Sequence, residues 1–435
     1  MKNRWHLLVI LICFFLAGAF AASSAVAGER LPGKVHRMLS EVSTLLSNQQ
    51  YEEAIHQLES FQNLAPEKSR QSRNRGHHHY LITFALGNSY LGANRLEDAA
   101  KAYQLVLNDR PDYVPAGSNL GKTWYQLGRF EQAAETFSRA YRMSKKQEPR
   151  LLYLAAVSSL SAGLPAAALG KMQLLAREHP EDIRTSEQET HVRILFALNR
   201  NREALPVIRE IISAGSGSHL KTWRKMLLHQ YIALNMRQAA LRFAEVLINE
   251  EPLEPSWWRG LASVHLSEKN HEKALMAMTV VRQLKPLTTE EKKLMASLNL
   301  FLDIPIQSAR VYERLPLSEM TAEAVKALVH SYLKLDNIKA AQKWLEYGVQ
   351  HYRDKDLLHL KANLHFEQEQ FEAASNSYEQ LVMSYPDMGQ AWLMWGYSAW
   401  MHGEEATARR ALTRAGTFNE QRSFAHAILK QMDNH

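Results

Sequence analysis

The stretch that decides the fold is YLITFALGNSYLGANRLEDAAKAYQLVLNDRPDY, residues 80–113, and the next 34 residues repeat its landmarks. A Leu-Gly pair, an aromatic residue, an alanine and a second aromatic residue recur at the same offsets. In the first copy they are Leu86, Gly87, Tyr90, Ala99 and Tyr103, and in the second Leu120, Gly121, Trp124, Ala133 and Phe137. A period of this length is typical of repeat proteins built from one supersecondary unit. The sequence therefore predicts a stack of similar units.

The same pattern extends over most of the chain. An alanine is followed twelve residues later by a proline at Ala54/Pro66, Ala99/Pro111, Ala168/Pro180, Ala240/Pro252, Ala274/Pro286 and Ala374/Pro386. Alanine allows two helices to pack closely, and proline cannot continue a helix, so this interval is typical of the second helix of a hairpin and its end. We expect an all-α chain of about eleven units, with 181–220 and 288–320 as degenerate copies.

These landmarks resemble the tetratricopeptide repeat (TPR). The resemblance implies a TPR solenoid, a right-handed superhelix of stacked helical hairpins that bury together the faces none can bury alone. We expect a first unit at 34–66, further units at 80–212 and 220–421, and a capping helix and tail at 422–435. A polar, basic seam at 67–79 and a flexible seam at 213–219 separate them.

The N-terminus has the features of an export signal. Two basic residues precede an apolar run over 7–20, and the sequence AVA at 25–27 fits the cleavage pattern of a secretory signal peptide. We therefore expect a signal peptide over 1–27 and a mature protein in a bacterial periplasm. The alternative is an uncleaved inner-membrane anchor over 7–27, which is about long enough to cross a bilayer.

Composition and motifs argue against several classes of function. The chain is 46% apolar and 22% charged, which is ordinary for a globular protein. Its formal charge is +7, but the basic residues are interspersed with acidic ones rather than clustered, which argues against nucleic acid as a partner. The single cysteine, Cys13, lies in the expected signal, so the mature protein has no disulfide framework or thiolate site. We expect no enzyme activity and no cofactor.

Three local patterns imitate functional motifs. The stretch 117–123, GSNLGKT, lacks the glycine spacing of a phosphate-binding loop and contains repeat landmarks. His77–His79 lie in the basic seam, where we expect solvated side chains. His271 and Glu272 lack the second histidine of an H-E-x-x-H zinc motif. We therefore expect neither a nucleotide site nor a metal site.

The resemblance also implies a binding surface. In TPR proteins the first helix of each unit lines a concave groove and contacts the ligand from a fixed set of positions. The matching residues here are Asn88, Lys122, Tyr125, Lys225, His229, Arg259, Lys326, His330, Lys334, His359, Asn363, Tyr397 and Trp400. Their modest basic bias suits an extended or acidic peptide. A carboxylate clamp is not expected, because Phe84 stands at its lysine position.

Tryptophans and tyrosines allow more than one interpretation. Trp392 and Trp395 fall on packing positions of the last repeat, whereas Tyr397 and Trp400 fall on groove positions and are candidate anchors for a partner. Trp257 has no assigned position in the repeat, and we interpret it as facing the neighbouring unit.

These features together predict an exported, non-catalytic scaffold that binds proteins. Contact with a membrane would come only through a retained N-terminal segment or a membrane-bound partner. The stretch 254–262, EPSWWRGLA, with the degenerate unit over 294–312, resembles the TPR subunits that accompany TonB–ExbB–ExbD systems. The resemblance implies an accessory role in energy transduction. The alternative is a scaffold for envelope assembly, in polysaccharide export, secretion or outer-membrane biogenesis.

Overall fold

The computed structural model describes residues 31–64, 76–215 and 219–433. The expected signal peptide at 1–27 lies outside these residues, as do Cys13 and parts of both seams. Within the described residues the regular elements are 23 α-helices and two short 3-10 helices, η2 (Pro180–Asp182) and η3 (Leu317–Glu319), with no strand. None of the described helices combines the length and apolar character needed to cross a membrane.

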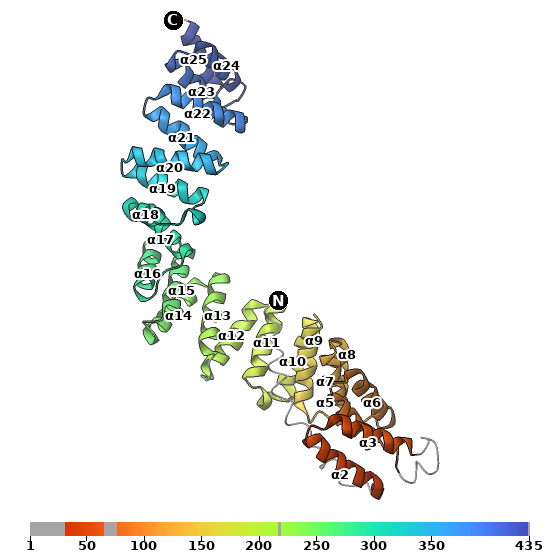
Figure 1. Ribbon diagram of the computed structural model, residues 1–435. Helices are drawn as coiled ribbons and strands as arrows, with labels where there is room; N and C mark the ends of the chain where they lie inside the picture. The colour runs from red at the N-terminus through yellow and green to blue at the C-terminus, as the bar shows by residue number, and fades with distance from the viewer. Residues whose placement is uncertain (1–30, 65–75, 216–218, 434–435) are drawn as a thin grey trace. The chain divides into compact units, whose positions relative to one another are not determined.

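The helices form eleven antiparallel hairpins and one last helix (Figure 1). The hairpins pair α2 (Gly33–Ser47) with α3 (Tyr51–Asn63), α5 (Tyr80–Gly92) with α6 (Leu96–Asp109), α7 (Val114–Gln126) with α8 (Phe130–Met143), α9 (Pro149–Ser161) with α10 (Pro165–Glu178), α11 (Thr185–Ala197) with α12 (Asn201–Ser213), α13 (Leu220–Ala233) with α14 (Arg237–Glu250), α15 (Pro255–Ser267) with α16 (His271–Leu284), α17 (Thr289–Phe301) with α18 (Pro305–Tyr312), α19 (Ala322–Lys334) with α20 (Ile338–His351), α21 (Lys355–Glu367) with α22 (Phe371–Ser384), and α23 (Gly389–His402) with α24 (Glu405–Ala415). The last helix is α25 (Arg422–Asp433). The predicted all-α fold and the expected number of units are confirmed.

Each hairpin turns on one residue in the left-handed region, placed two positions before the second helix. The φ angles lie between 54° and 92°, and the residues are Gln49, Asn94, Gly128, Gly163, Asn199, Asn235, Lys269, Asp303, Asp336, Glu369 and Gly403. Glycine and asparagine adopt this conformation most readily, and they occupy six of the eleven positions. The turn closes by a backbone bond such as that from Arg95 N–H to the Tyr90 carbonyl, at 2.8 Å.

The Leu-Gly and aromatic landmarks mark the contact between the two helices of a hairpin. A Cβ on Gly87 would lie 2.7 Å from Cε1 of Tyr103, and a Cβ on Gly121 would lie 2.7 Å from Cε1 of Phe137. Both rings are buried, because the glycines leave room for them against the first helix. The repeat spacing in the sequence therefore reflects one packing contact that recurs along the chain.

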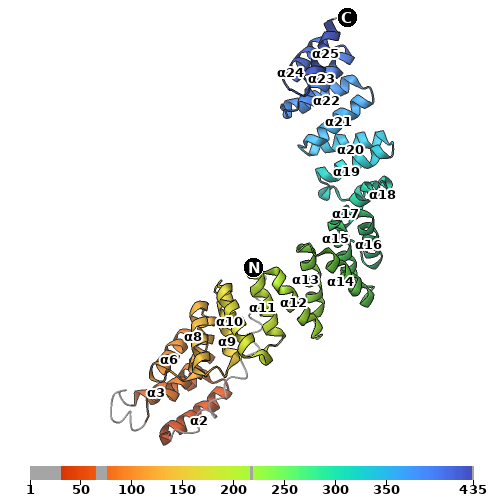
Figure 2. The same ribbon diagram turned by 180° about the vertical axis from the view of Figure 1, so that it is seen from behind.

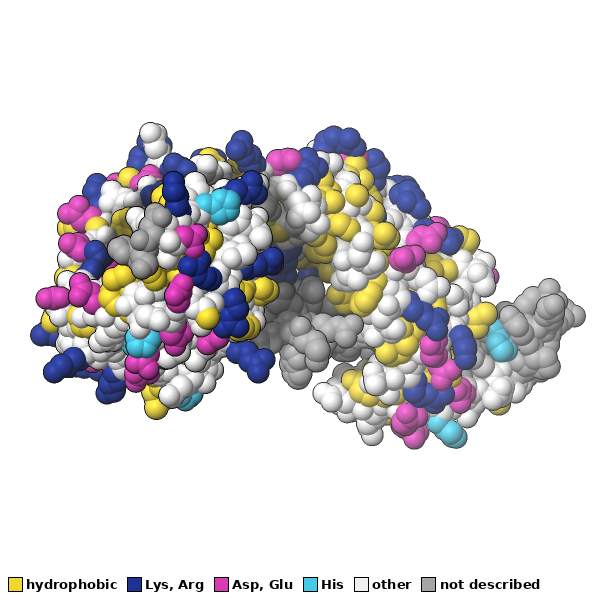
Figure 3. All heavy atoms as spheres, turned by 90° about the horizontal axis from the view of Figure 1, so that it is seen from above, with side chains coloured by type: hydrophobic (Ala, Val, Ile, Leu, Met, Phe, Trp, Pro, Cys, Tyr) yellow, Lys and Arg dark blue, Asp and Glu magenta, His cyan; other side chains and the backbone are white. Residues whose placement is uncertain are grey.

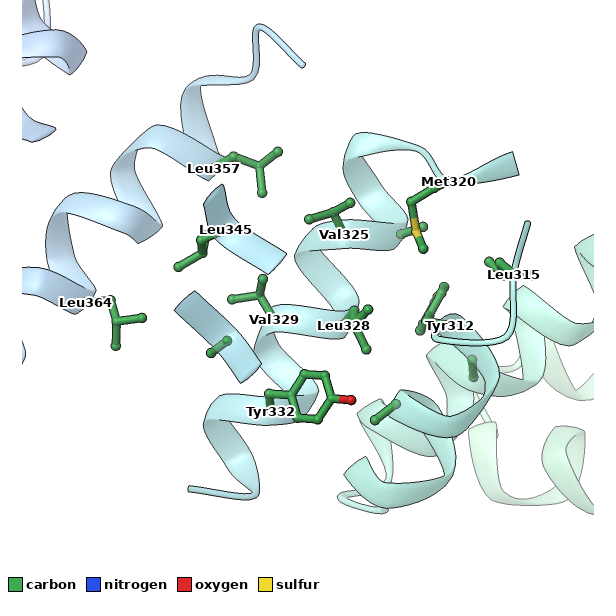
Figure 4. Packing of buried hydrophobic residues seen from close by; sticks show 14 residues of the cluster. Tyr312, Leu315, Met320, Val325, Leu328, Val329, Tyr332, Leu345, Leu357 and Leu364 are labelled. Carbon is green, nitrogen blue, oxygen red and sulfur yellow. The ribbon is translucent and has the colours of Figure 1, made fainter. Parts of the chain in front are cut away.

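The chain divides into two compact units, Met1–Leu227 and Leu228–His435. Within each unit successive hairpins stack on one another, as the view from behind also shows (Figure 2). In the second unit a cluster of buried residues joins α18, α19, α20 and α21 across three repeats. Val325, Leu328 and Val329 of α19 lie between side chains of the neighbouring helices (Figure 4). At the end of this unit α25 buries Ala425 and Met432 and exposes Arg422, His426, Lys430 and Gln431.

One expectation for the first seam is wrong. His77 was expected to be solvated, but its side chain is only 1% exposed. A turn at 76–78 places the imidazole against α3, where its ring lies 4.6 Å from that of Phe61 and its Nδ1 lies 2.8 Å from the Phe61 carbonyl oxygen. The histidine therefore contributes to packing between the first two hairpins.

Candidate partner-binding surface

In the first unit, two of the predicted binding residues already have polar partners in the neighbouring repeat. The Oδ1 of Asn88 accepts hydrogen bonds from the Tyr103 hydroxyl at 2.7 Å and from Nδ2 of Asn119 at 2.9 Å. The hydroxyl of Tyr125 lies 3.0 Å from Oγ of Ser161. These bonds connect α5, α7 and α9, so the two side chains hold the repeats together before any partner binds.

Lys122 differs from these two residues. It is half-buried on α7 and forms no ion pair within the described parts of the chain. Burial, with the nearby Arg150 guanidinium, lowers the pKa of its amino group. Arg150 itself lies over the ring of Tyr153 and 3.3 Å from the carboxylate of Glu187. Lys122 is therefore a cation with which an acidic group of a partner could still pair.

In the second unit, basic side chains occupy the fifth residue of four consecutive first helices, at Arg259, Lys293, Lys326 and His359. The Arg259 guanidinium donates to both carboxylate oxygens of Glu291, and this bond lowers the pKa of Glu291. Lys326 lies 3.1 Å from Asp354 and 3.3 Å from Asp356, both from the next repeat.

These pairs change the electrostatic interpretation of the groove. Each acid comes from the start of the following first helix, so the basic positions stabilise the stacking of repeats. Basic and acidic side chains are likewise interspersed over the face seen in Figure 3. The basic bias of the sequence is therefore largely neutralised at Arg259 and Lys326.

The remaining basic positions are exposed. They are Lys225, His229, His330 and Lys334, and the Nζ of Lys334 lies 2.7 Å from Oδ1 of Asp303. His330 stands one helical turn from Lys326 and from Lys334. Partial burial of its ring and these two lysines lower the pKa of its imidazole.

Four half-buried rings form a continuous strip in the second unit, which we call the aromatic row: Phe371, Phe366, Tyr397 and Trp400. Successive ring centroids are 5.8, 5.8 and 6.1 Å apart. The sequence singled out Tyr397 and Trp400 but missed the two phenylalanines. Phe371 opens α22 and Phe366 lies near the end of α21, so the row crosses three helices.

The neighbouring tryptophans have structural roles. Trp395 is 4% exposed and packs 5.4 Å from Trp392, whose Nε1 donates to the Pro386 carbonyl at 2.8 Å. The same bond, also 2.8 Å long, links Trp258 to the Pro252 carbonyl four repeats earlier. Trp257 is fully buried and donates from Nε1 to Glu251 at 3.2 Å.

The phosphate-loop pattern does not form the site that it imitates. Residues 117–123 lie inside α7, so their amides are helical and cannot cradle a phosphate. His179, Glu181 and Asp182 bring possible ligand atoms within 4.8 Å of one another. The Nε2 of His179 also lies 2.9 Å from the Tyr141 hydroxyl, which ties this cluster to the packing of α8 against the end of α10.

Comparison with known proteins identifies the repeat. A family model for the tetratricopeptide repeat matches residues 84–148, 119–183, 233–285 and 359–420. No curated protein has a matching sequence. A solved Naa15/Naa10 complex bound to HypK-THB is 13% identical with a TM-score of 0.48, and the match covers 90% of this chain and 64% of that one.

Other solved structures are similar over shorter stretches or at lower scores. A tetratricopeptide repeat protein from Parabacteroides merdae ATCC 43184 is 11% identical with a TM-score of 0.34, covering 68% of this chain and 98% of that one. MamA from Desulfovibrio magneticus RS-1 is 16% identical with a TM-score of 0.32, covering 39% of this chain and 93% of that one. The present chain thus spans less than two thirds of the Naa15-complex chain that it matches.

Proposed function

This chain belongs to the tetratricopeptide repeat family, and we propose that it is an exported, non-catalytic scaffold that binds other proteins through its repeat surfaces. Proteins of this family bind protein partners. The observation that carries the proposal is the half-buried aromatic row, because tryptophan and tyrosine are enriched among the residues that dominate binding energy at protein interfaces.

We further propose that the scaffold is an accessory subunit of a TonB-type energy-transduction complex. Two features of the sequence support this role. The stretch 254–262 resembles the repeat subunits of such systems, and the apolar segment 7–27 would direct the chain through the inner membrane or hold it there. A periplasmic location follows from cleavage of that segment, and a membrane-anchored location from its retention.

A scaffold for envelope assembly is the second candidate, and the aromatic row also favours it. Aromatic rings provide flat apolar surfaces on which the apolar face of a sugar ring can stack. In this case Tyr397 and Trp400 would contact a glycan, and the other repeats would hold proteins of a polysaccharide-export or secretion machine.

Site-specific photocrosslinking in the native envelope tests these proposals. A photoreactive residue replaces Tyr125, Lys225, Lys334 or Trp400, one at a time, and the crosslinked proteins are identified by mass spectrometry. Glu135, exposed on the second helix α8, is the matched control position. Crosslinks to TonB, ExbD or an uptake receptor support the energy-transduction role, and crosslinks to export machinery support the assembly role.

Two results would contradict these proposals. Crosslinks no stronger at the four test positions than at Glu135 would refute binding along this face. A Tyr397→Ala/Trp400→Ala variant that keeps its partners and its glycan binding would remove the aromatic row from the proposal. Membrane fractionation after high-salt washing distinguishes a free periplasmic chain from one anchored by residues 7–27.

A further inference from the structure

A surface pocket lies beside the aromatic row, between the turns of the last two hairpins. Its volume is about 360 Å³, and its lining residues are Glu369, Gln370, Phe371, Glu372, Ala373, Met401 and His402. Phe371 belongs to both the pocket and the aromatic row, so the two features form one continuous surface. Met401 is 47% exposed, so its apolar side chain is open to contact at the edge of the pocket.

The turns around this pocket are acidic. Residues 367–373 and 401–406 contain five exposed glutamates and no lysine or arginine: Glu367, Glu369, Glu372, Glu404 and Glu405. Glu405 pairs with Arg409 at 2.8 Å, and Glu372 lies 3.9 Å from Nε2 of His402. The remaining three form no ion pair within the described part of the chain. A protein with a formal charge of +7 therefore presents a locally negative rim here.

We propose that the pocket and the aromatic row together dock a basic segment of a partner protein that carries an apolar anchor. The inference rests on the proposed function and names the partner's chemistry. An aliphatic or aromatic side chain enters between Phe371 and Met401, and flanking lysines or arginines pair with Glu369 and Glu372. Further basic groups can lie over the faces of Tyr397 and Trp400.

A second copy of this chain does not fit the same surface in a symmetric contact. In a symmetric dimer through this edge, the glutamates of one copy would face those of the other, and like charges in an interface are unfavourable. A short segment with the opposite charge avoids this repulsion.

A direct binding experiment tests the inference. Fluorescein-labelled peptide KKFLKK is titrated into the full chain and followed by anisotropy, beside the control peptides EEFLEE and KKSSKK. We expect KKFLKK to bind at least about tenfold more tightly than either control, and its affinity to fall as salt rises from about 50 to about 300 mM.

Variants locate the binding. Glu369→Gln/Glu372→Gln is expected to lower the affinity for KKFLKK about fivefold, as expected when two exposed ion pairs are lost. Met401→Ser is expected to lower the affinity independently of these charges. The matched control is Glu52→Gln/Glu53→Gln, an exposed pair at the start of α3 in the first unit, which leaves binding unchanged. All four side chains are exposed glutamates, and an unchanged circular dichroism spectrum verifies that each variant is folded.

Equal binding of EEFLEE and KKFLKK would overturn the inference, as would equal affinities of the wild type, the Glu369→Gln/Glu372→Gln variant and Met401→Ser. If KKFLKK does not bind while Trp400 still crosslinks to envelope proteins, this inference fails and the proposed scaffold function stands. If KKFLKK does not bind and no groove position crosslinks to envelope proteins, both this inference and the proposed scaffold function fail.

Discussion

Gly121→Ala and Gly170→Ala make the same chemical change in the first unit, and we expect them to have different effects on stability. Gly121 lies in α7, where a Cβ would be 2.7, 2.8 and 2.9 Å from three atoms of the Phe137 ring. That ring is 1% exposed, so it has no free space to move into. Gly170 is exposed on α10, and no heavy atom lies within 4 Å of its added Cβ.

The magnitude follows from two opposing effects. Alanine is favoured over glycine inside a helix by about 1 kcal/mol, and this gain applies equally to both positions. Forcing an extra methyl group into a filled core typically destabilises a protein by about 1–3 kcal/mol, and this loss applies only to Gly121. The free energy of unfolding should therefore rise by about 1 kcal/mol in Gly170→Ala, and Gly121→Ala should be about 1–3 kcal/mol less stable than that variant.

Urea denaturation of the full chain, followed by circular dichroism, measures the difference. Stacked repeats need not unfold in one step, so the comparison uses midpoints of variants that share the same slope. Gly87→Ala is a replicate, because its Cβ would lie 2.7 Å from the Tyr103 ring. If Gly121→Ala proves as stable as Gly170→Ala, the packing explanation of the Leu-Gly landmark is refuted. In a Phe137→Leu background the difference should shrink, since the ring that clashes is gone.

Three further predictions concern the turns, the junctions between repeats and pH. Lys269 has a left-handed backbone at φ 58°, which glycine adopts without strain. We therefore expect Lys269→Gly to raise the free energy of unfolding, measured by heat or urea, by about 0.5–1 kcal/mol. A lower free energy of unfolding would show that Lys269 is not strained. Tyr378→Phe removes the 2.6 Å bond to Asn363, and its free energy of unfolding should fall by about 1 kcal/mol; unchanged stability would show that water replaces the bond. Hydrogen bonds from Lys146 and Tyr141 together lower the pKa of Glu178 from 4.5 to about 2. Since the folded-state pKa is the lower one, this stabilisation is present above pH 4.5 and lost as pH falls toward 2, so Glu178→Gln should flatten the acid side of the stability profile.

The hairpin architecture could be predicted from the sequence because it depends on short-range spacing. The interval from Gly87 to Tyr103 is fixed by one packing contact, and that contact recurs wherever the spacing does. The turn residues were harder to predict. Gly128 and Asn94 give a signal for a left-handed backbone, but Lys269 and Glu369 adopt it only because the flanking helices pack.

The binding surface was less predictable, since it depends on contacts between repeats. The sequence places Arg259 at a groove position, but its pairing with Glu291 depends on how far two side chains reach between stacked helices. Phe366 and Phe371 fall outside the landmark positions, so nothing in the sequence separates a half-exposed ring from a core ring. His77 was misjudged for a related reason, because a local turn buries it within a polar stretch.

In the described part of the second unit, charged side chains between repeats are paired, whereas most glutamates at the last two hairpin turns are not. Acids at the start of α17 and α21 neutralise Arg259 and Lys326 of the preceding repeats, so these two basic residues mainly hold the stack together. The glutamates at the last two turns have no such basic counterparts, apart from Glu405 and Glu372. A partner that approaches this edge therefore meets uncompensated charge next to exposed apolar surface. In the docking that we propose, recognition depends on the hairpin turns, where sequence can vary without disturbing the contacts between repeats.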